Sequence, residues 1–217
     1  MEIPHLKPRA LEPIVETEDD LRKAIFLDFE EEKAKLAEFL HDEVAQLLFQ
    51  LKNQSEHNFN PELQSEISQA LERVRNASFE LKPRIFETLG LFAALKELFS
   101  KRFNYISHEA FNNFIKLSDN LGDAMESAIF RLTQQTLDCL DVDLLRGLSM
   151  NVNRLDDGIL CLTYGFAFNP DKPSIPRTDF AEKLRSVVYL LSGKMIFREY
   201  EQNQLEVVIY LDEDISA

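Results

Sequence analysis

The hydrophobic pattern opens with a long helical stretch that has a single apolar face. Between Thr17 and Asn60 the chain contains no proline or glycine, and apolar residues recur every three or four positions among many Glu and Lys residues. This spacing puts the apolar side chains on one stripe of an α-helix. Thr17, with Asp20 three residues later, is a favourable helix start. We predict one long helix here, preceded by an extended, proline-containing tail.

A second helix is predicted to fold back against the first. Asn60 and Pro61 form a turn, Pro61 suits a first helical position, and the apolar residues that follow again share one face. Two helices of this length cannot hide both stripes from water alone, so we expect a homodimer in which two hairpins form a four-helix bundle. Pro83 blocks simple continuation of the second helix. Helical spacing of apolar residues resumes over 89–99, and Gly90 marks a local break there.

The pattern changes from about residue 103 to mixed helices and strands. Helical spacing covers 125–145 and 178–191, and strand patterns cover 148–152, 159–168, 194–200 and 205–211. Asp156, Asp157 and Gly158 read as a hairpin turn. We therefore expect an α+β fold, with a helical hairpin followed by an α/β sandwich whose helices lie on one sheet face. The predicted division is a tail (1–18), a helical domain (19–100) and a sandwich domain (101–217).

Composition and charge exclude several classes of function. The 217 residues are 45% apolar, enough for a real core, and 24 Lys and Arg against 38 Asp and Glu give a net charge of −14. Such a charge argues against nucleic-acid binding, which needs a basic surface. Cys139 and Cys161 lie outside any zinc-binding pattern, so no metal site is expected. Without a signal peptide or a long apolar run, we expect a soluble, cytoplasmic protein with no membrane contact.

Glycine usage argues against a nucleotide-binding loop. The chain has only six glycines, and no two are closer than seven residues. Loops that cradle phosphates need clustered glycines so that backbone N–H groups can approach the anion. A P-loop, a dinucleotide fingerprint and a protein-kinase glycine loop are therefore not predicted.

The candidate chemistry lies in the first helix, at His41, Asp42 and Gln46. Asp42 follows His41 directly, and Gln46 lies one helical turn beyond Asp42, so the three side chains are neighbours. A neutral imidazole can attack a phosphoryl group, and an adjacent carboxylate can fix its tautomer or accept a proton. Gln46 could instead orient a water molecule for hydrolysis. On spacing alone, His41 is also compatible with being one more polar residue on an acidic helix.

The stretch that reads EFLHDEVAQLL, residues 38–48, resembles the phospho-accepting helix of a group of sensor histidine kinases that includes nitrate sensors and desaturase thermosensors. Downstream, residues 80–95 resemble the segment that leads out of the second helix in that group. Residues 126–132, ESAIFRL, resemble the start of the helix that holds the ATP-binding asparagine. The resemblance spans roughly residues 20–212 and implies a hairpin followed by a catalytic-like domain.

The same resemblance shows where this chain departs from a kinase. The family's asparagine helps to hold magnesium and phosphates, but residues 121–150 contain no asparagine. Where the family has a DxGxGF motif for adenine, residues 162–168 read LTYGFAF. The family's late Gly-Thr pair reads QLE at residues 204–206, and the ATP-lid region is a short, proline-spaced loop. These departures imply that ATP chemistry is lost.

The resemblance then implies a histidine phosphotransferase, which passes phosphoryl groups between receiver domains of response regulators without ATP. His41 would be the nucleophile, Asp42 would orient or deprotonate it, and Gln46 would position water if the protein dephosphorylates a receiver. No cofactor is expected, because the receiver brings its own magnesium. Three alternatives remain open: a non-catalytic dimeric adaptor, a phosphatase that binds a response regulator, and a divergent sensor histidine kinase.

Overall fold

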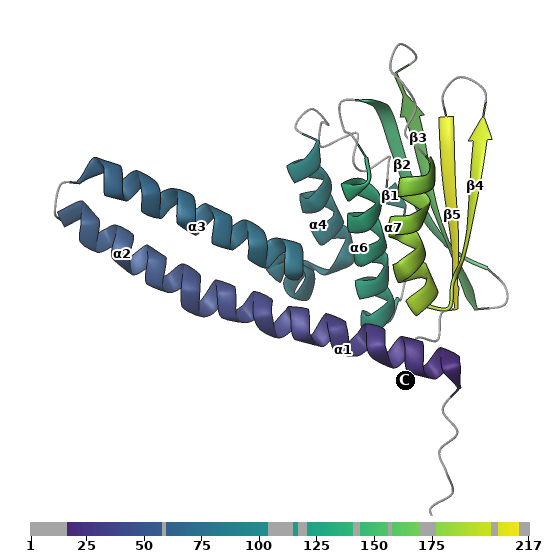
Figure 1. The fold of residues 1–217 in the computed structure, drawn as a ribbon, viewed down its shortest axis with the longest axis horizontal. Helices are drawn as coiled ribbons and strands as arrows, with labels where there is room; N and C mark the ends of the chain where they lie inside the picture. The colour runs from purple at the N-terminus through teal and green to yellow at the C-terminus, as the bar shows by residue number, and fades with distance from the viewer. Residues whose placement is uncertain are drawn as a thin grey trace, which may run out of the picture.

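The computed structural model describes residues 17–57, 60–103, 115–116, 121–140, 144–155, 158–169, 177–200 and 204–212. Its helices are α1 (Glu18–Glu38), the π-helical segment η1 (Phe39–Val44), α2 (Ala45–His57), α3 (Pro61–Leu81), α4 (Arg84–Arg102), α6 (Asp123–Asp138) and α7 (Arg177–Leu190). Its strands are β1 (Ile115–Lys116), β2 (Leu145–Arg154), β3 (Ile159–Phe168), β4 (Lys194–Tyr200) and β5 (Gln204–Asp212). A helical hairpin precedes an α/β sandwich, which confirms the predicted α+β class (Figure 1).

The hairpin begins and turns where the sequence predicts. Thr17 Oγ1 accepts a hydrogen bond from the Asp20 backbone N–H at 3.1 Å, and the Asp20 carboxylate accepts one from the Thr17 N–H at 3.0 Å. This reciprocal cap satisfies N–H groups that a helix start leaves unpaired. At the start of α3, the Asn60 side chain accepts from Leu63 N–H at 3.2 Å, and Pro61 occupies the first helical position.

Small side chains let the two arms of the hairpin approach each other closely. Ala37 and Ala45 on the first arm and Ser78 on α3 are all buried. Ser78 Oγ donates a hydrogen bond to the Ala37 carbonyl oxygen at 3.0 Å, which joins α3 to α1 just before η1. The two arms run antiparallel side by side and extend away from the sheet (Figure 1).

Helix α4 turns the chain from the hairpin into the sandwich. Pro83 is its N-cap, and Gly90 has φ 79° and ψ −177° inside it. A positive φ of this kind suits glycine, so the helix breaks there as predicted. Beyond Gly90, α4 buries an apolar face against α6. Phe99 and Phe103 stack with ring centroids 6.1 Å apart.

The sheet has five strands in the order β1-β2-β3-β5-β4. β1 pairs with β2 in parallel, and the other neighbours are antiparallel. The β2–β3 hairpin turns at Gly158, which has φ 71°; Asp156 and Asp157 of the predicted turn lie outside the described residues. The short parallel pairing of β1 was not predicted from the sequence, because two residues carry too little periodicity.

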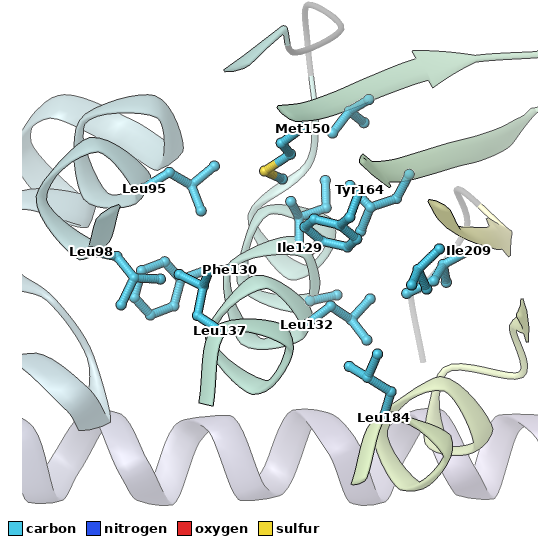
Figure 2. Packing of buried hydrophobic residues seen from close by; sticks show 14 of the residues in the cluster. Leu95, Leu98, Ile129, Phe130, Leu132, Leu137, Met150, Tyr164, Leu184 and Ile209 are labelled. Atoms are coloured by element: carbon cyan, nitrogen blue, oxygen red, sulfur yellow. The ribbon is translucent and has the colours of Figure 1, made fainter. Parts of the chain in front are cut away.

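Alternate residues of the strands face one side of the sheet, and α6 and α7 cover that side (Figure 1). On β3 every second side chain from Leu160 to Phe168 is buried. Figure 2 shows Tyr164 and Ile209 of the sheet facing Ile129 and Leu132 of α6. The buried face of α4 joins the same cluster, so one hydrophobic core continues across the predicted boundary at residue 100.

One predicted helix is wrong at its C-terminal end. The sequence predicts a helix over 125–145, but α6 ends at Asp138 and β2 already begins at Leu145. Leu140 and Leu144 continue the helical spacing of α6, which explains the misassignment. Leu145 instead pairs with Phe168 across the β2–β3 ladder, so strand pairing outweighs the local helical pattern.

The N-terminal half of α1 extends past the end of α3 and packs against the sandwich (Figure 1). Phe26 of α1 is buried in the sandwich core. At the end of α7, Ser192 Oγ donates to the Asp19 carboxylate at 2.9 Å, and the Arg22 guanidinium lies 3.9 Å from the centre of the Tyr189 ring. Helix α1, which leads into the segment that carries His41, is therefore in direct contact with the sandwich.

A second face of the first arm leaves large apolar side chains exposed. We call these side chains the exposed stripe: Leu21, Ile25, Phe29, Leu36, Phe39, Leu47 and Leu51. Successive members are four, four, seven, three, eight and four residues apart. None of the described helices is long and apolar enough to cross a lipid bilayer. The stripe is thus an unpartnered surface on a single chain.

Candidate functional site

His41 lies inside η1, where the first arm of the hairpin forms a π-helix instead of an α-helix. At the end of this segment the Ala45 N–H donates to the Leu40 carbonyl, five residues back. A π turn holds one more residue than an α turn, and such turns occur frequently at functional sites. The His41 side chain is partly exposed. It is held on a rigid helix, yet a partner molecule can reach it.

A first hollow, of about 360 Å³, opens on the side of His41 that faces the sandwich. It lies between the end of α1 and the junction of α3 and α4. Its lining combines three acidic and three basic side chains with His41: Glu31, Ala34, Lys35, Ala37, Glu38, His41, Asp42, Ser78, Lys82, Pro83 and Arg84. The chain as a whole has many more acids than bases, so this balance of charge is local to the hollow.

Asp42 lines the first hollow and is paired with Arg84. Arg84 Nη1 lies 3.2 Å from Asp42 Oδ1, although the two residues are 42 positions apart in the chain. Both side chains are substantially exposed, at 64% and 40%. Within the described part of the chain, the Asp42 carboxylate forms no hydrogen bond with the His41 ring. The predicted role of Asp42 in orienting His41 stays a prediction.

A second hollow, of about 390 Å³, opens toward the tip of the hairpin. It is lined by His41, Ala45, Gln46, Phe49, Gln50 and Arg75. Gln46 therefore shares a hollow with His41, as its spacing predicts, but not with Asp42, which lines the first hollow. Phe49 is 49% exposed and gives this hollow an apolar wall, while Arg75 comes from α3 on the other arm. His41 is the residue common to both hollows.

A buried arginine fixes the geometry around this site. Arg131 of α6 donates two hydrogen bonds to Glu30 of α1, from Nε at 2.9 Å and from Nη2 at 3.1 Å. The Arg131 side chain is only 7% exposed. Lys33 shares Glu30, at 3.1 Å, and burial followed by the Arg131 charge lowers the pKa of Lys33. Two cations thus compete for one carboxylate at the contact between α1 and α6.

The same guanidinium also binds the C-terminal end of α3. It donates to the Glu80 carbonyl at 3.2 Å and to the Leu81 carbonyl at 2.9 Å, and Gln134 donates to the Glu80 carbonyl at 2.9 Å. These carbonyls have no partners within the helix, and positive charge is favourable at a helix C-terminus. We call Glu30, Arg131, Gln134 and the two carbonyls the arginine clamp. It holds α1, α3 and α6 together beside the first hollow.

The aromatic side chains of β3 are packed as ordinary core. Tyr164, Phe166 and Phe168 all face the helices, with successive ring centroids 6.3 and 6.4 Å apart. The Tyr164 hydroxyl lies 2.7 Å from Thr133 Oγ1, which in turn donates to the Ile129 carbonyl at 2.7 Å. Burial raises the pKa of Tyr164 well above its usual range. The hydroxyl is a structural hydrogen-bond donor.

Other polar side chains of α6 are also engaged in structural contacts. Asp138 forms an ion pair with Arg102 of α4, and Gln134 contacts both the carbonyl and the carboxylate of Glu80. The described part of α6 therefore uses its polar groups to join the sandwich to the hairpin.

Comparisons with known proteins find distant structural similarity only. No protein-family model and no curated protein matches the chain. The histidine kinase AdeS of Acinetobacter baumannii is 12% identical, with a TM-score of 0.38 over 78% of this chain and 95% of that chain. The blue-light activated histidine kinase EL346 of Erythrobacter litoralis is 12% identical, with a TM-score of 0.42 over 90% of this chain and 60% of that chain. Full-length ShkA in complex with AMPPNP is 13% identical, with a TM-score of 0.39 over 90% and 46%.

Sequence reasoning missed the residues that reach the site from other helices. Arg84 and Arg75 line the hollows from beyond the hairpin turn, and Arg131 binds Glu30 from 101 positions away. No local spacing links these residues to His41. The only sequence signal is for Arg84, which follows Pro83 and so begins a helix at the junction.

Proposed function

We propose that this chain is a histidine phosphotransfer protein of a two-component phosphorelay. In the proposed step, a ring nitrogen of neutral His41 attacks the phosphorus of an aspartyl phosphate on a receiver domain. A P–N bond forms, the P–O bond to the aspartate breaks, and the aspartate leaves as a carboxylate. The reverse step on a second receiver returns His41 to its neutral form. No nucleotide takes part, and the receiver supplies magnesium.

The observation that carries the proposal is the position of His41 between two hollows on a rigid helical hairpin. Phosphoryl transfer needs in-line approach, and His41 can be approached from the solvent side along either arm. The second hollow combines exposed Phe49 with polar Gln46, Gln50 and Arg75 around it. An apolar centre with a polar rim is typical of a transient protein interface, and Arg75 suits an acidic receiver.

The packing of the sandwich supports a route without ATP. Tyr164, Phe166 and Phe168 are committed to the core, and Asp138 is paired with Arg102. A nucleotide-binding version of this region needs flexible glycine backbone, whereas residues 162–168 of β3 contain one glycine among three packed aromatic rings. The sandwich then serves as a scaffold that is joined to the hairpin by the arginine clamp.

A homodimer is part of the proposal. The exposed stripe runs along the whole first arm, and a second hairpin would cover it in a four-helix bundle. His41 lies outside the stripe, so both histidines of the dimer would remain accessible. The dimer would present two equivalent acceptor sites.

Receiver dephosphorylation is a second candidate, favoured by one observation. Gln46 and His41 line the same hollow, so an amide is in place to orient a water molecule near a docked aspartyl phosphate. Water would then attack phosphorus, and inorganic phosphate would leave instead of a phosphohistidine. The two functions share one docking surface and differ in the nucleophile.

The deciding experiment mixes purified protein with receiver domains phosphorylated by acetyl phosphate, without ATP. The expected result is acid-labile phosphate on His41, absent in His41→Ala. Gln46→Ala should leave the label intact, and Gln54→Ala, on the exposed side of α2, serves as its matched control.

Each other outcome points to a different function. Faster loss of receiver phosphate that depends on Gln46, without label on His41, would indicate a phosphatase. Binding of receivers that survives His41→Ala, with no phosphoryl movement, would indicate a non-catalytic adaptor. Saturable binding of ATP with magnesium, followed by labelling of His41 from ATP, would indicate a divergent kinase and contradict the proposal.

A further inference from the structure

Arg84 is a cation at the proposed acceptor site that does not belong to the hairpin itself. It is the first residue of α4, directly after Pro83, and its side chain reaches back to Asp42 at 3.2 Å. It lines the first hollow together with His41. The arginine clamp binds the carbonyls of Glu80 and Leu81, so the junction that carries Arg84 is fixed relative to the hairpin.

A phosphoryl group on His41 creates a charge problem at this place. The group carries close to two negative charges near neutral pH, and the Asp42 carboxylate follows His41 directly in the chain. Glu31 and Glu38 line the same hollow. Without a cation, like charges would oppose both formation and retention of phosphohistidine.

We infer that Arg84 exchanges Asp42 for the phosphoryl group of phosphorylated His41 and neutralises its charge. This inference rests on the proposed phosphotransfer function. The existing Arg84–Asp42 pair is exposed and uses one guanidinium nitrogen, so it contributes little stability and is easily rearranged. Arginine binds phosphate through two parallel N–H···O bonds, which are stronger than an exposed contact to a carboxylate. No covalent bond to Arg84 is made or broken. Its guanidinium leaves one anion, the Asp42 carboxylate, and pairs with another, the phosphoryl group.

Lys35 also lines the hollow, but it binds Glu31 at 2.8 Å and Glu32 at 3.6 Å on its own helix. Arg84 pairs instead with Asp42, the residue next to His41. The exchange therefore links a chemical change at His41 to the position of the α3–α4 junction.

The test phosphorylates His41 chemically with phosphoramidate, so that no receiver is needed. Phosphorus NMR then follows the second ionisation of the phosphoryl group with pH. A neighbouring guanidinium favours the dianion, so its pKa should be lower in the wild type than in Arg84→Ala, with Arg84→Lys in between. Arg73→Ala, an exposed arginine of α3 outside both hollows, should match the wild type.

A second measurement follows transfer from a phosphorylated receiver to His41 at increasing receiver concentration. Arg84→Ala should lower the maximal rate about tenfold and leave the half-saturating receiver concentration unchanged. Equal phosphoryl pKa values in the wild type and Arg84→Ala would overturn the inference, whatever the receivers do. Receivers that fail to label His41, while phosphoramidate labels it, would overturn the proposed function and leave the inference to be decided by NMR. A His41 that phosphoramidate cannot label would overturn both.

Discussion

Arg131 and Glu30 form a two-pronged ion pair between α6 and α1, with nitrogen–oxygen distances of 2.9 and 3.1 Å. The pair is largely buried, and the same guanidinium binds two carbonyls at the end of α3. Buried charges are costly unless their hydrogen bonds are satisfied, and here the Arg131 fork has a partner in each direction. The pair therefore helps to hold the sandwich on the hairpin.

Replacing Arg131 by methionine should destabilise the protein strongly. The substitution leaves Glu30 with Lys33 alone and the Glu80 carbonyl with Gln134 alone. The Leu81 carbonyl loses its partner. Loss of one member of a buried pair costs up to about 3–5 kcal/mol. Urea unfolding measures the change. Arg146→Met, at an exposed position of β2, is the matched control and should change stability by less than about 0.5 kcal/mol.

Hydrogen exchange distinguishes loss of the clamp from general loosening. In Arg131→Met, amide protons of the first half of α1 should exchange faster because that segment opens locally. Amide protons in the α2–α3 part of the hairpin should lose only as much protection as the lower global stability explains. Uniform acceleration over the whole chain would contradict the view that the clamp acts at this one contact.

Replacing Tyr164 by phenylalanine should have a cost that depends on pH. Near neutral pH the lost hydrogen bond to Thr133 should cost about 1–2 kcal/mol. Burial raises the pKa of folded Tyr164 above its usual value of 10.0, so the folded state keeps its proton where the unfolded state loses it. The contribution of the hydroxyl is therefore fully present below about pH 10 and declines as pH rises, by up to about 1.4 kcal/mol per pH unit.

Urea unfolding at pH 8 and pH 11 checks this sign. The stability difference between the wild type and Tyr164→Phe should shrink or reverse at the higher pH. Phe166→Leu removes core packing without a titratable group, and its cost should stay the same at both pH values. A constant difference for Tyr164→Phe would show that the hydroxyl does not stay protonated in the fold.

Introducing a charge into the exposed stripe should abolish the proposed dimer. Leu47 is 59% exposed on the single chain, and glutamate there would be buried without a partner in a four-helix bundle. Sedimentation velocity should give a dimer for the wild type and a monomer for Leu47→Glu, with helical circular dichroism unchanged. Leu155→Glu, an exposed leucine at the end of β2, should remain dimeric; a monomeric wild type would overturn the prediction.

Elements that depend on local chemistry could be predicted from the sequence. Thr17 with Asp20 marks a helix start, Asn60 with Pro61 marks a turn, and Gly90 marks a break, and the structure confirms all three. Each of these signals acts within a few residues. Strand β4 was predicted with its observed bounds, because it is flanked by turn residues on both sides.

Contacts between distant segments could not be predicted in the same way. His41 and Gln46 share a hollow because they lie close together on one helix, and spacing is enough to find them. Arg84 meets Asp42 across the α3–α4 junction, and the Arg131 contacts at that junction involve three separate helices. The end of α6 was misplaced for a similar reason, since pairing of β2 with β3 decides it.

The π turn at Phe39–Val44 also sets the rotation of α2 about the helix axis relative to α1. A π turn is equivalent to one inserted residue, so the eight-residue step from Phe39 to Leu47 acts like a seven-residue step, about two full α-helical turns. Without the extra residue, everything beyond the turn would rotate by about 100° relative to α1. The stripe would then split into two faces. The same insertion that displays His41 therefore keeps the apolar surfaces before and after it in line.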